Sequence, residues 1–211
     1  PDALEDEAVS LSLKIVDQNI EFADWLTNIR CDALGNRCRI ELNSSNLIKD
    51  QHYRRDKLLS AWVMHLAGHL TGKPMTSNLL GKNGEVRLKQ MEPEVAKQEF
   101  LMLCEAYIEG LCHPLPFAPK TSLNWLEAKG EEFSGDLIDY KHKAVEKAQK
   151  SYEGDYKLHG EVENNAYLLR IYPNFETLWS DGAFTLWAHR LLKKLTETIG
   201  KDLPKDAGGE Q

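Results

Sequence analysis

Alternation of apolar and polar residues near the start of the chain constrains the fold more than any other feature of the sequence. In residues 8–16, apolar residues occupy every second position. Successive side chains of a β-strand point to opposite faces, so this period predicts a strand with one buried face. Residues 20 to about 31 and residues 37–43 predict two more strands. Three sequential strands with short connections predict an antiparallel β-meander over residues 8–43.

The hydrophobic period changes to that of a helix after the third strand. Leu59, Trp62 and Leu66 recur at helical spacing, and we expect a helix from about Asp56 to Leu70 that packs this face on the strands. An Asn-Gly pair marks the turn of a second hairpin at about residues 78–90. Residues 93–200 show mostly helical patterns. The sequence therefore predicts an α+β fold, with an antiparallel β-meander packed against helices and a mostly helical C-terminal half.

Length and composition favour one domain of an ordinary globular protein. The chain has 211 residues, of which 42% are hydrophobic and 28% charged. We expect a single domain over residues 1–204, followed by a mobile polar tail at 205–211. Because the first residue is not Met, we expect a fragment of a longer chain. We see no signal peptide and no apolar run near the ~20 residues of a membrane span. We therefore expect a cytoplasmic protein with reduced cysteines and no membrane contact.

Residues 37–43 contain part of the pattern of a metal-dependent nuclease. In many DNA-cutting folds such a strand carries an acidic residue and, two positions later, a lysine. Here the acidic residue is Glu41, but Asn43 occupies the position of the lysine. The acidic-x-lysine triplet does occur at Asp139-Tyr140-Lys141, but within a helical pattern, where residues two apart point in different directions. Metal-assisted cleavage needs the acid and the lysine side by side, so neither segment is a complete site.

Other catalytic and cofactor motifs are missing from the sequence as well. Neither the P-loop nor the dinucleotide-binding glycine pattern occurs, so we expect no nucleotide cofactor. His65 and His69 have the i, i+4 spacing that allows two imidazoles to bind one metal, but the glutamate of the HExxH pattern is missing. We therefore predict no metal site and interpret both histidines as polar residues on the face of the helix.

Basic residues are concentrated in the strands and at the start of the first helix. They are Arg30, Arg37, Arg39, Arg54, Arg55 and Lys57. This group could contact DNA phosphates, or it could be an ordinary solvated strand face. The net charge of −7 predicts that DNA binding by the isolated chain would be weak.

Three segments, taken together and in order, resemble the C-terminal domain of RecC, the gamma chain of exodeoxyribonuclease V. They are LLSAWVMHLA at 58–67, EGLCHPLPFAPKTSLNWL at 109–126 and AQKSYEG at 148–154. The resemblance implies a fold similar to that of PD-(D/E)XK nucleases without cleavage activity. It also implies RecB and RecD as partner subunits in a helicase and nuclease complex that processes DNA ends for recombinational repair. Any contact of this part of the complex with DNA would be to the phosphate backbone of the DNA.

The resemblance places the degenerate nuclease positions at Thr27, Glu41 and Asn43, since active relatives have Asp, an acid and lysine there. Two other functions stay open. The chain could be an active nuclease with a migrated lysine, such as Lys49 or Lys57, or a scaffold that holds subunits together without touching DNA. Two tryptophans, Trp125 and Trp179, could be interface anchors or core residues.

Overall fold

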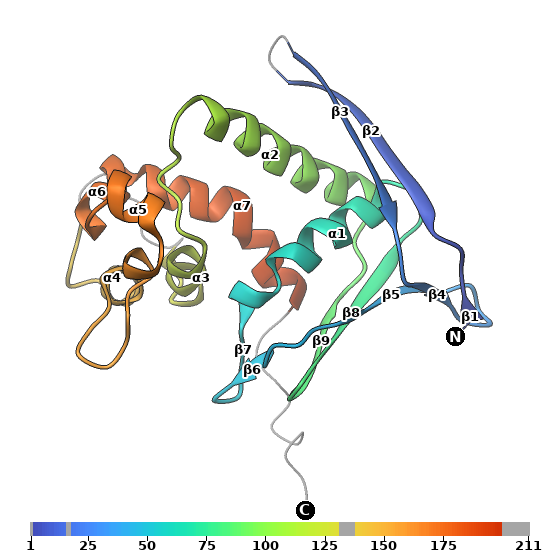
Figure 1. The fold of residues 1–211 in the computed structure, drawn as a ribbon, viewed down its shortest axis with the longest axis horizontal. Helices are drawn as coiled ribbons and strands as arrows, with labels where there is room; N and C mark the ends of the chain where they lie inside the picture. Colours follow the sequence, from blue (N-terminus) through green and yellow to red (C-terminus); the bar gives the residue numbers. More distant parts are fainter. Residues whose placement is uncertain (1, 16–17, 131–137, 200–211) are drawn as a thin grey trace, which may run out of the picture. The chain divides into compact units, whose positions relative to one another are not determined.

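We describe a computed structural model of the chain, in which residues 2–15, 18–130 and 138–199 are described (Figure 1). The chain divides into two compact units. One comprises residues 1–103 and 197–211, and the other comprises residues 104–196. We treat each unit by itself, and the single domain over residues 1–204 stays a prediction. The expected tail at 205–211 lies outside the described residues.

The first unit is built on a five-stranded mixed sheet in the order β1-β4-β5-β8-β9. Its strands are β1 (Asp2–Ala3), β4 (Ile29–Cys31), β5 (Arg37–Leu42), β8 (Met75–Gly81) and β9 (Gly84–Leu88). Neighbouring strands are antiparallel except β5 and β8, which are parallel. A parallel pair needs a crossover between its strands, and helix α1 (Leu59–His69) lies in the connection from β5 to β8.

The predicted meander over residues 8–43 is wrong in one respect, although the α+β class is confirmed. Strands β2 (Glu7–Ile15) and β3 (Gln18–Leu26) form a separate two-stranded sheet, visible as the long hairpin in Figure 1. The expected strand at 20–31 ends at Leu26 and resumes as β4 at Ile29. Between them Asn28 has a φ of +61°, a left-handed conformation that Asn tolerates better than most residues. This bend divides the chain between two sheets.

Helix α1 covers one face of the sheet, as the sequence predicts. Trp62 and Leu66 are fully buried, as expected. Leu59 is only half-buried, and the preceding residue, Leu58, is fully buried in its place. The expected start at Asp56 lies in a 3-10 turn (Arg55–Lys57) just before the helix. The close approach of the helix to β8 depends on Gly68, because a Cβ there would lie 2.3 Å from the Met75 methyl group.

Two small hairpins complete the strands of the first unit. The predicted second hairpin is confirmed as β8 and β9, joined at Lys82-Asn83. A shorter one, which the sequence pattern did not reveal, pairs β6 (Ile48–Lys49) with β7 (His52–Tyr53). The Asn83 side chain connects the two hairpins, since its Oδ1 accepts from the Leu47 backbone N–H at 2.9 Å. Asn83 thus stabilises the loop as well as the turn.

The second unit is helical, as predicted for this part of the chain. It contains α3 (Pro119–Glu127), α4 (Lys143–Glu153), α5 (Ala166–Ile171), α6 (Phe175–Trp179) and 3-10 turns at Val162–Asn164 and Ser180–Gly182. The boundary between the units falls within α2 (Pro93–Cys112) and within α7 (Ala183–Ile199). Trp125 and Trp179 are each 1% exposed, so both are core residues of this unit rather than surface anchors.

The Asp139-Tyr140-Lys141 triplet lies in a turn and not within the helix that its sequence pattern had led us to expect. The Asp139 carboxylate accepts a hydrogen bond from the Lys141 backbone N–H at 3.0 Å, and α4 begins at Lys143 with His142 as its N-cap. The four cysteines are free thiols, as expected. None of the described helices is long and apolar enough to cross a membrane.

Candidate functional site

The first two positions that the resemblance marks as degenerate, Thr27 and Glu41, lie just before β4 and within β5. Ile29 pairs with Arg39 across β4 and β5, and the Ile40 backbone N–H donates to the Asn28 carbonyl at 3.1 Å. Thr27 lies before this pairing, on the other side of the bend at Asn28, whereas Glu41 lies within β5. A nuclease of this type would have its metal-binding pair of carboxylates at these two positions, and this chain has a single one.

The Glu41 carboxylate is already bound by an arginine on its own strand. The Arg39 Nη1 donates to the Glu41 Oε2 at 2.6 Å, and the Arg39 side chain is only 9% exposed. Asn43 does not replace a catalytic lysine, because its Oδ1 caps a turn by accepting from the Ser45 backbone N–H at 2.9 Å. Within the described residues, no three His, Cys, Asp or Glu side chains are grouped so that they could hold a metal ion.

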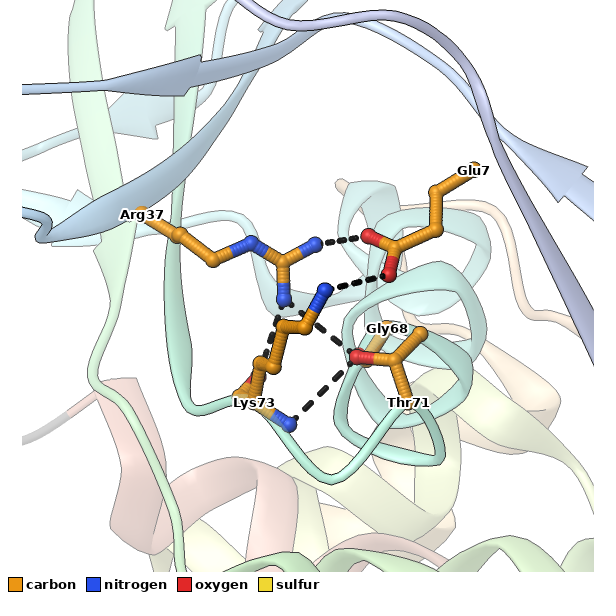
Figure 2. Close-up of polar contacts among 5 residues, drawn as sticks. All are labelled: Glu7, Arg37, Gly68, Thr71 and Lys73. Atoms are coloured by element: carbon orange, nitrogen blue, oxygen red, sulfur yellow. Dashed lines mark hydrogen bonds and ion pairs between the residues drawn. The ribbon is translucent and has the colours of Figure 1, made fainter.

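The second arginine of β5 is part of a polar cluster that connects the hairpin, the sheet and the end of α1. Figure 2 shows Arg37 pointing toward Glu7 of β2, with which it forms an ion pair. Its Nη1 also donates to the Thr71 Oγ1 and to the Lys73 carbonyl, both at 3.3 Å. The Lys73 Nζ lies 3.2 Å from the other Glu7 oxygen. Arg37 thus has a structural role in joining these segments.

The five arginines that the sequence grouped together differ in accessibility. Arg37 and Arg39 share one strand face, as expected, but it is the face toward α1 and not an open face: they pair with Met75 and Ser77 of β8, which lie beneath that helix. Arg55 is also buried. The remaining two, Arg30 and Arg54, are half-buried. DNA contact through the five stays a prediction, and it would require the β5 arginines to leave their carboxylate partners.

Further exposed basic side chains lie outside the basic group named from the sequence, of which Lys57 is itself exposed. They are Lys49, Lys82, Arg87 and Lys89. For Arg87 and Lys89, the sequence signal was the alternation of apolar and basic residues at 86–89. Val86 and Leu88 are fully buried, so the basic residues that alternate with them point outward. Residues 30–91 contain 11 Lys and Arg against 5 Asp and Glu, a net charge of +6 within a chain of −7. The sheet region is thus locally basic.

His65 and His69 lie in the core and not on a polar helix face as we expected. The His65 Nε2 donates to the Lys89 carbonyl at 3.1 Å, so its Nδ1 accepts from the Ser77 hydroxyl at 2.8 Å. The His69 Nδ1 donates to the His65 carbonyl at 2.8 Å, and its Nε2 accepts from the Met91 backbone N–H at 3.1 Å. Both nitrogens of each ring are used within the protein, and these hydrogen bonds require neutral imidazoles.

Burial, together with the smaller effect of the nearby His69, lowers the pKa of His65 from 6.5 to about 3. The unfolded chain therefore binds more protons than the folded chain between these two values, and stability is lost as the pH falls through this window. We expect His65→Gln to reduce the slope of unfolding free energy against pH by up to about 1.4 kcal/mol per pH unit near pH 5.5. Urea unfolding at pH 5 to 7 measures this slope. The same change at the exposed His189 serves as the control, and an unaltered slope in His65→Gln would show that His65 is protonated in the folded protein.

Two comparisons with known proteins agree with each other. The sequence matches the family described as the RecC C-terminal domain over residues 2–130. It is 25% identical over 162 residues to the RecBCD enzyme subunit RecC of Escherichia coli (strain K12). This match covers 75% of the chain and 14% of the relative, so the chain spans a small part of that subunit's length. The family match extends over more than half of the chain, which therefore belongs to the RecC C-terminal domain family.

Proposed function

We propose that this chain is a non-catalytic module of a RecC-type subunit, acting in the cytoplasm in a complex that processes DNA ends for recombinational repair. Its role there is to position DNA strands and to dock the partner subunits RecB and RecD. The family membership supports the assignment to such a complex. The parallel β5-β8 pair with its helical crossover is consistent with a PD-(D/E)XK-like ancestry of the sheet.

The ion pair between Arg39 and Glu41 is the observation that carries the non-catalytic assignment. A catalytic carboxylate must bind a divalent cation or activate water. The Glu41 carboxylate instead forms an ion pair with Arg39, whose Nη1 lies 2.6 Å from the Glu41 Oε2. With Thr27 and Asn43 at the other two positions, the site lacks a second carboxylate and a lysine.

We further propose that the locally basic sheet region contacts DNA phosphates. Contacts of this kind orient a strand and carry little sequence preference. We expect weak binding, because the acidic remainder of the chain repels DNA. Since each neutralised phosphate releases about 0.9 counterions from duplex DNA, the affinity should fall steeply with salt.

Replacing Lys49, Lys82 and Lys89 with Gln tests the phosphate contacts. We expect the slope of log affinity against log salt to become less steep by up to about 2.7, if all three reach phosphates. Fluorescence anisotropy with a labelled duplex, measured at several salt concentrations, gives the slope. A control variant with Lys143, Lys147 and Lys150 of α4 changed to Gln has the same change in net charge and should keep the wild-type slope. Equal losses in both variants would show a general charge effect without a DNA-binding surface.

Two further experiments address the alternative functions. Linear DNA incubated with the purified chain and Mg²⁺ or Mn²⁺ should stay intact; cleavage that is lost in Lys49→Ala or Lys57→Ala would establish an active nuclease with a migrated lysine. A pull-down with RecB-type and RecD-type chains tests docking. Partner binding together with no DNA binding at low salt would reduce the role to a protein scaffold.

A further inference from the structure

The open face of the five-stranded sheet contains a polar cavity of about 380 Å³. Met75 and Ser77 of β8 face α1, so the alternate residues Thr76 and Asn78 point to the opposite face. The strand residues Cys38, Thr76, Asn78 and Arg87 of the cavity wall lie on that opposite face, and Arg37 lines the cavity as well. The cavity wall is formed by Asp32, Asn36, Arg37, Cys38, Thr76, Asn78, Arg87 and Gln90. The Asp32 carboxylate accepts hydrogen bonds from Asn36. The volume of the cavity falls within the range of small-ligand sites, about 300–1,000 Å³.

One wall residue has an unsatisfied hydrogen-bonding atom. The Asn78 Oδ1 is buried and accepts no hydrogen bond from the described residues. A buried carbonyl oxygen without a donor is costly, and such an atom in a native fold calls for a ligand or water that supplies the donor. Asn36 and Gln90 add two more carboxamides to the wall. Carboxamide side chains are suited to the donor and acceptor edges of nucleobases.

A positive charge lies at the same cavity. Arg87 of β9 is the register partner of Asn78, and its side chain is exposed. Among the described residues Arg87 has no ion-pair partner. Its guanidinium group is thus available for a phosphate, for which its planar set of donors is suited. A ligand that offers both a base edge and a phosphate would match the carboxamides and the guanidinium group of the wall.

We propose that this cavity binds one unpaired nucleotide of single-stranded DNA, with the base edge at Asn78 and the phosphate at Arg87. This inference rests on the proposed DNA contact of the sheet region. Only an unpaired base can enter, because the edges of a paired base are already hydrogen-bonded to its partner. The cavity wall has no aromatic side chain, so affinity comes from hydrogen bonds and the phosphate rather than from stacking.

The test compares two variants of the 211-residue chain. Asn78→Leu has a similar size and removes the unsatisfied oxygen, so the fold should keep its thermal stability while affinity for a single-stranded octanucleotide falls about tenfold. Affinity for duplex DNA should be unchanged. Arg87→Gln should make the salt slope for the single strand less steep by about 0.7, the value of one phosphate. Amide chemical shifts measured with the octanucleotide should change at residues 36–38, 76–78 and 87–90.

The four deoxynucleoside monophosphates, tested separately, distinguish a free nucleotide from a DNA strand. Cavity shifts with a monophosphate but none with the octanucleotide would overturn DNA as the source of the ligand. If Asn78→Leu binds the octanucleotide like the wild type while the three-lysine variant binds less tightly, the cavity proposal fails and the phosphate contacts stand. If no DNA binds the wild type at low salt and no cavity shift appears, both DNA proposals fail, and the subunit pull-down alone decides the function.

Discussion

Trp62→Ala is expected to lower the free energy of unfolding by about 3–5 kcal/mol, the usual range for removing a large buried aromatic side chain. The indole is on the buried face of α1, where it is 1% exposed and lies 5.8 Å from the His65 ring, centroid to centroid. Its removal leaves a cavity between the helix and the sheet. Urea denaturation followed by circular dichroism gives the free energy from the midpoint and slope.

Two variants make this result specific to packing. Trp62→Phe keeps most of the ring and removes the indole N–H, which has no hydrogen-bond partner among the residues that the structure describes. We therefore expect a much smaller loss. Trp25 is 61% exposed, and Trp25→Ala should change stability by less than about 0.5 kcal/mol, as is usual for surface positions. A loss in Trp62→Ala no larger than in Trp25→Ala would contradict the packing of α1 on the sheet.

The second large effect is expected at Glu41, and it concerns stability rather than catalysis. Glu41→Leu leaves the buried Arg39 guanidinium without its carboxylate, and Arg39 Nε already has no partner. Removing one member of a buried ion pair typically costs about 3–5 kcal/mol. Because the Glu41 side chain is 26% exposed and water can reach the pair, we expect a loss of about 2–3 kcal/mol.

The double variant Arg39→Met with Glu41→Leu distinguishes a structural role of Glu41, in the ion pair with Arg39, from a catalytic role. Both charges are removed, so stability should recover to within about 1 kcal/mol of the wild type. Unfolding measured for the two single variants and the double variant gives the coupling energy. Additive losses would show that the two side chains act independently and would weaken the assignment of Glu41 to a structural pair.

Local sequence patterns determined the type of most elements. A period of two predicted the strands, helical spacing predicted α1, and Asn83-Gly84 predicted the β8-β9 hairpin, because each depends on residues close together in the chain. The lack of lysine at Asn43 and of a second acid at Thr27 could also be seen from the sequence. The family resemblance likewise followed from short segments.

Only the tertiary structure decided which strands share a sheet and which faces are buried. The bend at Asn28 moves the β2-β3 hairpin out of the five-stranded sheet, and alternation alone does not show where one strand becomes two. The polar face of β5 points toward α1 because Glu7, which lies 30 residues before Arg37 in the chain, provides one carboxylate, and Glu41 provides another. The Ser77 hydroxyl and the backbone groups of Lys89 and Met91 likewise bind the buried imidazole rings, alongside the His65 carbonyl on the same helix. Most of these partners are distant in sequence, and the burial of a polar side chain is decided by such partners rather than by its position in a local pattern.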